Sequence, residues 1–124
     1  MLKRGFKTLL AEANAQIETV SVQDLDFALD DSDTVLVDVR ETVERESQGA
    51  IPGSVHAPRG LLEFHADPES PAYNKELDPE CRLILYCGTG GRSALAAKTL
   101  LDMGYSDVAS LAGGYAAWKS AQGK

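Results

Sequence analysis

The stretch Tyr86-Cys87-Gly88-Thr89-Gly90-Gly91-Arg92-Ser93 combines a potential nucleophile with a loop that can bind anions. An apolar run ends next to Cys87, three glycines follow within four residues, and a helical pattern begins at about Arg92 or Ser93. In a loop of this kind between a strand and a helix, successive backbone N–H groups point inward and form an anion-binding concavity. The start of the helix adds partial positive charge at the same place.

Cys87 lies at the mouth of this concavity, where a cysteine becomes reactive. Amide dipoles and a helix start favour the thiolate, so we expect the pKa of Cys87 to lie below the value of about 8.5 for a free cysteine. We expect the loop to stay partly wet, so that burial does not cancel this effect. The pattern predicts a thiolate nucleophile beside a binding site for an anionic donor or leaving group. The residues expected to form this binding site are Gly88, Thr89, Gly90, Gly91, Arg92 and Ser93, with Arg59 at the rim.

Two arginines can supply positive charge to such a site. Arg92 is the cation of the loop itself, and its guanidinium can pair with an anionic donor. The alternative is that Arg92 caps the helix or pairs on its surface. Arg59 follows Pro58 in an irregular stretch, from which it can reach the rim of the pocket. Both arginines are therefore candidates for binding substrate.

The second cysteine, Cys81, has no comparable surroundings. It precedes a strand and no glycine loop follows it, so we expect an unreactive thiol. The extended chain from Cys81 to Cys87 spans about 20 Å, which excludes a disulfide between them. His56 and His65 do not have the spacing of a zinc site with these cysteines. We therefore expect chemistry that uses the Cys87 thiol without a metal.

The composition is that of a single ordinary domain. The chain has 124 residues, of which 44% are apolar and 25% charged, so it can bury a core without disulfides or metals. Nineteen acidic residues outnumber twelve basic ones, for a net charge of −7. This balance disfavours binding to nucleic acids and to membrane surfaces, which both attract positive charge. The sequence shows no signal-peptide core and no membrane-spanning run. The expected location is the reducing cytoplasm, where a free thiol is usable.

Short apolar, β-branched runs alternate with helical patterns along the chain. The runs that predict strands are 34–39, 54–56, 83–86 and 108–111. The helical patterns are 6–17, a segment opened by Thr19-Val20-Ser21 with Ser21 as its cap, 61–64, 93–103 with Gly104 as its stop, and 115–120. All five prolines fall between Pro52 and Pro79, so that stretch is mostly irregular. The alternation predicts an α/β fold: a mainly parallel sheet of four or five strands flanked by helices, with strand 83–86 central.

Four segments, in this order, resemble the rhodanese family over residues 19 to 119. They are Val37-Asp38-Val39-Arg40-Glu41, Gly49-Ala50-Ile51-Pro52-Gly53-Ser54, the loop from Tyr86 to Ser93, and Gly113-Gly114-Tyr115-Ala116-Ala117-Trp118. The resemblance implies a rhodanese-like domain at 19–120, which leaves 1–18 as an N-terminal helical extension. It also implies that Asp38 and Arg40 form a structural polar pair near the site. Trp118 is expected to pack the last helix on the sheet.

The resemblance implies a sulfurtransferase. The Cys87 thiolate would attack the outer sulfur of thiosulfate or a persulfide, and the loop would hold the resulting persulfide. A thiol or cyanide would then accept the sulfur, and no cofactor would be needed because the thiol itself does the sulfur chemistry. The implied partners are these small molecules alone, with the protein a monomer or a homodimer. Ala50 stands where the family commonly has His. Gly88 stands where thiosulfate-preferring members often have Arg, which argues against thiosulfate as the natural donor.

Two other functions stay open at this point. Related phosphatases use Cys-x5-Arg, whereas only four residues separate Cys87 from Arg92. The shorter loop makes a smaller bowl, which suits a sulfane sulfur better than a phosphoryl group. Rhodanese-like folds also serve as non-catalytic interaction modules, but such modules tend to lack the cysteine. The sequence therefore favours sulfur transfer over both alternatives.

Overall fold

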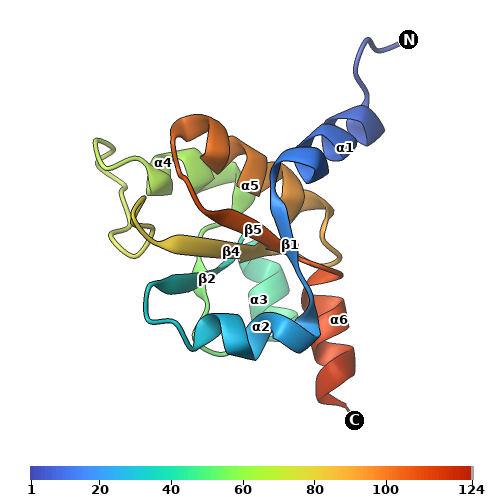
Figure 1. Cartoon of the computed structure of the whole chain (residues 1–124), viewed down its shortest axis with the longest axis vertical. Helices are drawn as coiled ribbons and strands as arrows, with labels where there is room; N and C mark the ends of the chain where they lie inside the picture. Colours follow the sequence, from blue (N-terminus) through green and yellow to red (C-terminus); the bar gives the residue numbers. More distant parts are fainter. Residues whose placement is uncertain (124) are drawn as a thin grey trace.

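Five strands and six α-helices alternate along residues 1–123, the part of the chain that the computed structural model describes (Figure 1). The strands are β1 (Glu18–Val20), β2 (Thr34–Asp38), β3 (Val55–His56), β4 (Arg82–Tyr86) and β5 (Val108–Leu111). The helices are α1 (Phe6–Gln16), α2 (Val22–Leu29), α3 (Thr42–Gln48), α4 (Leu62–Ala66), α5 (Gly91–Met103) and α6 (Gly114–Gln122), with the 3-10 turn η1 (Arg59–Leu61) before α4. None of these helices has the length and apolar character needed to cross a membrane.

The strands form one sheet in the order β1-β5-β4-β2-β3, and every neighbouring pair is parallel. β4 is central, because it pairs with β2 on one side and with β5 on the other. In the sheet, Leu85 lies opposite both Val37 and Ser110. The predicted α/β fold and the predicted central strand are confirmed. All five carboxyl ends lie toward one edge of the sheet, which is where ligands bind in open α/β folds.

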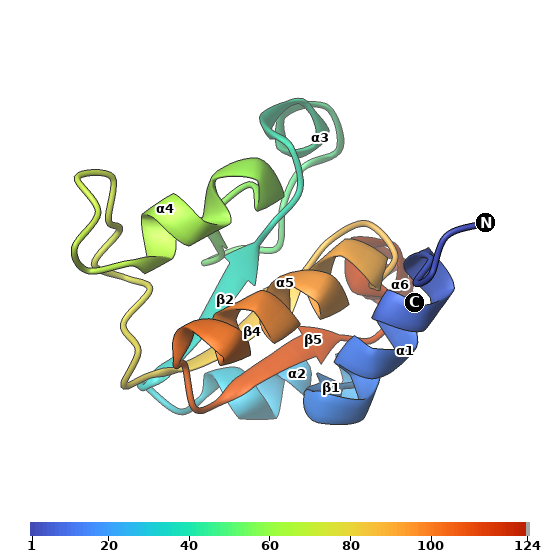
Figure 2. The ribbon, with the colours of Figure 1, turned by 90° about the horizontal axis from the view of Figure 1, so that it is seen from above.

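Helices cover both faces of the sheet, and the side chains of β4 alternate between two cores, as expected for a strand buried on both faces. Leu83 and Leu85 belong to the core that includes α4 and α5, whereas Ile84 and Tyr86 belong to the core that includes α2 and α6. Figures 1 and 2 show α5 on one face and α2 on the other. α1 packs against α5, so the helical extension expected at residues 1–18 lies on the domain.

The prediction that Thr19 and Val20 open a helix is wrong. They belong to β1, in which Val20 lies opposite Leu111 and its carbonyl accepts from the Ala112 N–H at 2.8 Å. Pairing with β5 fixes this three-residue strand, and local sequence carries little trace of it. The helix begins at Val22, and Ser21 caps it as predicted, because its hydroxyl accepts from the Asp24 N–H at 3.2 Å.

α3 was not predicted, and it lies beyond the carboxyl end of β2 (Figure 2). It has no buried residue, and its one large apolar side chain, Val43, is exposed. The usual apolar stripe of a helix is therefore missing. A capping box starts α3 instead: the Glu41 side chain accepts from the backbone of Glu44, and the Glu41 N–H donates to Glu44 Oε1 at 2.9 Å.

Asp38 ends β2 and is the centre of a buried polar network. Arg40 donates to it through Nε at 3.1 Å and through Nη2 at 3.0 Å, and both side chains are fully buried. Arg45 of α3 donates to Asp38 Oδ2 at 2.9 Å, and the Tyr86 hydroxyl does so at 3.0 Å. The Arg40 guanidinium lies 4.3 Å from the centre of the Tyr115 ring. The network thus joins β2, β4, α3 and α6.

The charge on Asp38 should be essential for stability. Burial raises the pKa of Asp38, but hydrogen bonds from Arg40 and Arg45 hold it below its usual value. We expect Asp38→Asn to lower the free energy of unfolding by about 3–5 kcal/mol, because Arg40 then stays buried without its counter-ion. The folded pKa lies below the unfolded value of about 3.9. The stabilisation is therefore present at neutral pH and lost as the pH falls through the folded pKa.

Urea titrations between pH 7 and pH 3 measure both effects. Asp26→Asn, on the exposed side of α2, is the matched control and should change the free energy of unfolding by less than about 0.5 kcal/mol. Equal losses in the two variants would contradict the role assigned to Asp38.

Candidate active site

β4 carries Cys87 to the carboxyl edge of the sheet, where the chain turns into α5. Gly90 precedes α5 with a φ of 113°, in a region that residues with a side chain rarely adopt. A glycine at this position lets the chain reverse between Cys87 and Gly91. The turn closes around the cysteine, whose exposed fraction is 1%.

Donors of the loop itself surround the sulfur of Cys87. The Gly90 N–H donates to Sγ at 3.1 Å and the Ser93 N–H at 3.4 Å. The Ser93 hydroxyl oxygen lies 3.5 Å from the same sulfur. A thiolate accepts hydrogen bonds more strongly than a thiol does, so this arrangement favours the ionised form.

The pKa of the Cys87 thiol is lowered even though the residue is buried. Burial raises the pKa, but the Ser93 hydroxyl and the amides of Ser93, Gly90 and Thr89 lower it by more. The loop is partly wet, as expected: Thr89 and Arg92 are exposed and Gly88 is half-buried, whereas the turn encloses the sulfur of Cys87. The direction of the pKa shift agrees with the expectation, since N–H and O–H groups of the chain take the place of water.

Ser110 of β5 forms a hydrogen bond with the Ser93 hydroxyl. The two hydroxyl oxygens are 2.8 Å apart, and Ser93 Oγ also lies 3.2 Å from the Gly90 carbonyl oxygen. When Ser110 donates to Ser93, the Ser93 proton can point to the sulfur. Ser110 was not predicted. The signal for it was a polar residue in the otherwise apolar run 108–111, since a buried hydroxyl needs a partner.

α6 is docked directly on the Cys87 loop. The Tyr115 N–H donates to the Cys87 carbonyl at 2.8 Å, and the Ala116 N–H donates to the Gly88 carbonyl at 3.0 Å. Gly114 has a φ of 60°, and a Cβ at this position would lie 2.5 Å from the Cys87 carbonyl oxygen. Only glycine fits so close an approach, which accounts for the second glycine before Tyr115.

Arg92 is paired with a carboxylate of the protein itself. Its Nη1 lies 2.7 Å from Glu44 Oε1, and its Nη2 lies 2.9 Å from Glu44 Oε2. The two contacts form a bidentate ion pair between α5 and α3. Pairing at the helix surface, the alternative to donor binding, is thus the arrangement that the structure has. Glu44 was not predicted, because nothing local to it indicates a partner on α5.

Arg59 is held away from the Cys87 loop. Its Nη1 donates to Glu63 at 3.1 Å and its Nη2 to the Thr99 hydroxyl at 3.2 Å. Thr99 lies eight residues after the start of α5, about 12 Å along the helix. The structure brings residues 88–93 together around Cys87 but does not bring Arg59 to them.

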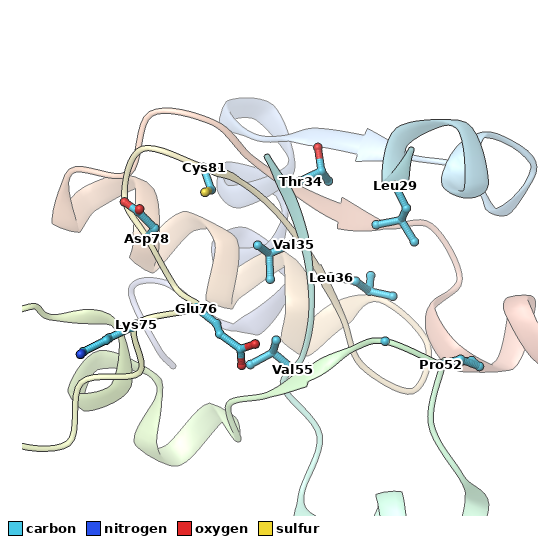
Figure 3. A pocket seen from close by; sticks show the side chains of 11 residues that line it. Leu29, Thr34, Val35, Leu36, Pro52, Val55, Lys75, Glu76, Asp78 and Cys81 are labelled. Carbon is cyan, nitrogen blue, oxygen red and sulfur yellow. The ribbon is translucent and has the colours of Figure 1, made fainter. Parts of the chain in front are cut away.

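Cys81 lies at the opposite end of β4 and lines a separate pocket of about 530 Å³. Figure 3 shows Cys81 and Asp78 at one end of this pocket and Leu36 and Pro52 at the other. Burial raises the pKa of Cys81, and the negative charges of Asp78 and Asp33 raise it further. Both cysteines are free thiols. The surroundings of Cys87 lower the pKa of its thiol whereas those of Cys81 raise it, so Cys87 is the better nucleophile. Residues 1–123 contain no cluster of three or more His, Cys, Asp or Glu side chains suited to a metal ion.

The profile of the rhodanese-like domain matches residues 21–121. The chain belongs to the rhodanese-like domain family. A relative in the family, the thiosulfate sulfurtransferase GlpE of Pseudomonas syringae, is 37% identical over 93 residues, which cover 75% of this chain and 79% of that protein. A sulfurtransferase of Allochromatium vinosum is 34% identical over 89 residues, with 72% and 75% covered.

One solved rhodanese-like structure extends the similarity to nearly the whole chain. It is a protein of unknown function from Rhodopseudomonas palustris, described as a possible tyrosine phosphatase. It is 44% identical, with a TM-score of 0.92, over 98% of this chain and 94% of that one. This likeness includes the residues before the family match, so α1 is not peculiar to this chain.

The Ser93 hydroxyl should set much of the reactivity of this rhodanese-like site. We expect Ser93→Ala to raise the pKa of Cys87, because the variant lacks the side-chain hydrogen bond that lowers it. Alkylation of Cys87 by iodoacetamide near neutral pH should slow by about tenfold, as for the loss of one hydrogen bond to a charged group. The measurement is the alkylation rate against pH. Thr99→Ala, which removes a hydroxyl farther along α5, is the control, and an unshifted midpoint in Ser93→Ala would contradict the assignment.

The contact between Gly114 and the Cys87 carbonyl gives a second prediction. We expect Gly114→Ala to destabilise the protein by about 1–3 kcal/mol through backbone strain alone, and to slow Cys87 alkylation because the loop must shift. Gly53→Ala separates the two causes: its φ is 82°, but a Cβ there meets nothing within 4 Å. Thermal unfolding and alkylation rates measure both variants. Gly53→Ala should lose stability without losing reactivity. If Gly114→Ala also kept full reactivity, the loop would not depend on α6.

Proposed function

We propose that this chain is a sulfurtransferase that carries a sulfane sulfur on Cys87. Relatives named as sulfurtransferases, at 34% and 37% identity, support rhodanese-type sulfur transfer. The main observation behind the proposal is the environment of the Cys87 sulfur. It is buried, it accepts hydrogen bonds from the amides of Gly90 and Ser93, and its pKa is lowered. Hydrogen bonds that favour the thiolate over the thiol make such a sulfur a better nucleophile.

The proposed reaction has two steps, and each is a displacement at sulfur. The Cys87 thiolate attacks the outer sulfur of thiosulfate or a persulfide, so that a new S–S bond forms. The bond from that sulfur to the donor breaks, and sulfite or a thiolate leaves with the electron pair. A thiol or cyanide then attacks the same sulfur and regenerates the Cys87 thiolate. Sulfur moves between nucleophiles as a neutral atom, so the cycle needs no external oxidant.

The loop amides have a second use in this scheme. We expect the persulfide on Cys87 to place its terminal sulfur among the N–H groups of residues 88–93, which then stabilise its negative charge. The Ser93–Ser110 pair keeps one hydroxyl beside the sulfur in both forms. The loop therefore stabilises the nucleophile before transfer and the intermediate after it.

A phosphatase is the second candidate, because the Rhodopseudomonas relative is described as a possible tyrosine phosphatase. Phosphate binding needs a bowl wide enough for a tetrahedral anion and an arginine free to clamp its oxygens. Here four residues separate Cys87 from Arg92, and Glu44 occupies both terminal nitrogens of that arginine. These two features favour sulfur transfer. The hydrogen-bonded Cys87 likewise argues against a purely non-catalytic module.

Cys87→Ser and Cys81→Ser test the proposal. Cys87→Ser should abolish transfer of sulfur from thiosulfate or glutathione persulfide to cyanide, because a serine hydroxyl does not ionise near pH 7 and forms no persulfide. Cys81→Ser should keep most of the activity. Mass spectrometry of the donor-treated protein should show one added sulfur atom, located on Cys87. Loss of activity in Cys81→Ser alone would mean that the other thiol carries the sulfur.

A phosphotyrosine analogue separates the two candidate functions with the same variants. Cys87-dependent hydrolysis of the analogue, without any added sulfur after donor treatment, would support the phosphatase and overturn the proposal. No gain of sulfur and no hydrolysis would leave Cys87 without either activity and would equally overturn it.

A further inference from the structure

We infer that Glu44 is a specificity-determining residue, which selects sulfur donors by the charge attached to their sulfane sulfur. This inference rests on the proposed function and names the donor class: persulfides of thiols rather than thiosulfate. It follows from where Glu44 and Arg92 lie relative to the Cys87 sulfur.

Glu44 is held in place before any substrate arrives. It is the third residue of α3, and the Glu41 N–H donates to its Oε1 at 2.9 Å. The same carboxylate accepts from Arg92 at 2.7 Å and 2.9 Å. Arg92 lowers the pKa of Glu44 to about 2, so the side chain is negatively charged at any pH near neutrality. Glu44 is thus a fixed anion, positioned by its own helix and by the loop cation.

Arg92 lies between this anion and the nucleophile. A Cβ at Gly88, the residue next to Cys87, would lie 3.2 Å from Arg92 Nη2. Glu44 raises the pKa of Arg92, burial opposes the shift, and the charge of Cys87 raises the pKa further. One cation therefore faces two anions, the Glu44 carboxylate and the Cys87 thiolate. With Cys87 as the reacting thiolate, these three side chains carry a net charge of −1 before a donor binds.

None of the neighbouring arginines hydrogen-bonds to Glu44 among the described residues, although the charge of Arg40 helps to lower the pKa of Glu44. Arg40 and Arg45 both donate to Asp38, and Arg59 is held by Glu63 and Thr99. Arg92 is therefore the cation beside the Cys87 loop with which a donor can pair, and Glu44 already accepts one hydrogen bond from each of its two terminal nitrogens.

The charge balance discriminates between the two kinds of donor. In thiosulfate, the sulfane sulfur is bonded directly to a sulfonate, and the whole ion carries two negative charges. To make a bidentate contact with the edge of Arg92 that Glu44 occupies, it has to displace Glu44 and leave that carboxylate unpaired. In glutathione persulfide, the carboxylates lie several bonds from the reacting sulfur, so the charge near Glu44 is smaller. Glu44 therefore penalises thiosulfate more than a persulfide.

Glu44→Gln tests the inference with little structural change. Glutamine keeps the length of the side chain and can still accept from the Glu41 N–H, since a capping box takes either residue. Glu46→Gln is the matched control: Glu46 is exposed on the same helix, and it makes no ion pair among the described residues. Both variants remove one negative charge from α3, but only the first frees Arg92.

The first measurement needs no assumption about catalysis. Iodoacetate is anionic and iodoacetamide is neutral, and both alkylate a thiolate. The ratio of their rates at Cys87 therefore reports the charge at the site. We expect this ratio to rise by about tenfold in Glu44→Gln, as for one screened charge within a few ångströms, and to stay at the wild-type value in Glu46→Gln. An unchanged ratio in Glu44→Gln, or an equal rise in both variants, would overturn the inference. Glu44→Ala repeats the test if the glutamine variant does not fold.

The second measurement uses the donors. In Glu44→Gln, kcat/KM for thiosulfate should rise by about tenfold relative to kcat/KM for glutathione persulfide, mainly through a lower KM. Equal losses with both donors would mean that Glu44 only holds the loop in shape, which contradicts its role in specificity. Absence of turnover with either donor in the wild-type protein would instead refute the proposed function, while the alkylation ratio would still decide the charge argument.

Discussion

Burying a negative charge on sulfur costs several kcal/mol unless donors of the protein replace the lost water. Cys87 meets this condition within one short segment: the amides of Gly90 and Ser93 donate to its sulfur, and the Ser93 hydroxyl, 3.5 Å away, lowers its pKa. These donors converge only because β4 delivers the cysteine to the edge of the sheet and α5 begins four residues later. The left-handed glycine at position 90 joins the two elements. The central strand, the turn and the long helix can all be understood as the support of one sulfur atom.

A second buried charge organises the other side of the site. Asp38, at the end of β2, binds Arg40 in the core and Arg45 on α3. Since α3 has no buried side chain of its own, this ion pair and the capping box take the place of an apolar contact in holding the helix near the loop. α3 in turn presents Glu44 to Arg92. The charge near the sulfur is therefore set through a chain of ion pairs that begins inside the fold.

The parts of the site that could be predicted from the sequence are those with local signals. The apolar run before Cys87, the glycines and the start of α5 are contiguous, so spacing alone indicates a strand, an anion-binding turn and a helix. Glu44 and Ser110 reach the loop only through tertiary structure. Nothing near Glu44 in sequence points to Arg92, and the one trace of Ser110 is that it is a polar residue in an apolar run. β1 is three residues long and depends on its pairing with β5. The enclosure of the Cys87 sulfur has no local signal either, because it depends on how the turn folds back over its own cysteine.

The two backbone hydrogen bonds between α6 and the Cys87 loop affect the order in which the site is assembled. The carbonyls of Cys87 and Gly88 find their donors on Tyr115 and Ala116, nearly thirty residues farther along the chain. During synthesis the loop leaves the ribosome well before those donors do. A nascent chain that ends inside β5 already has the nucleophile, its glycines and α5, yet two loop carbonyls still face water. We therefore expect the cysteine to reach its full reactivity only when α6 has docked on the loop.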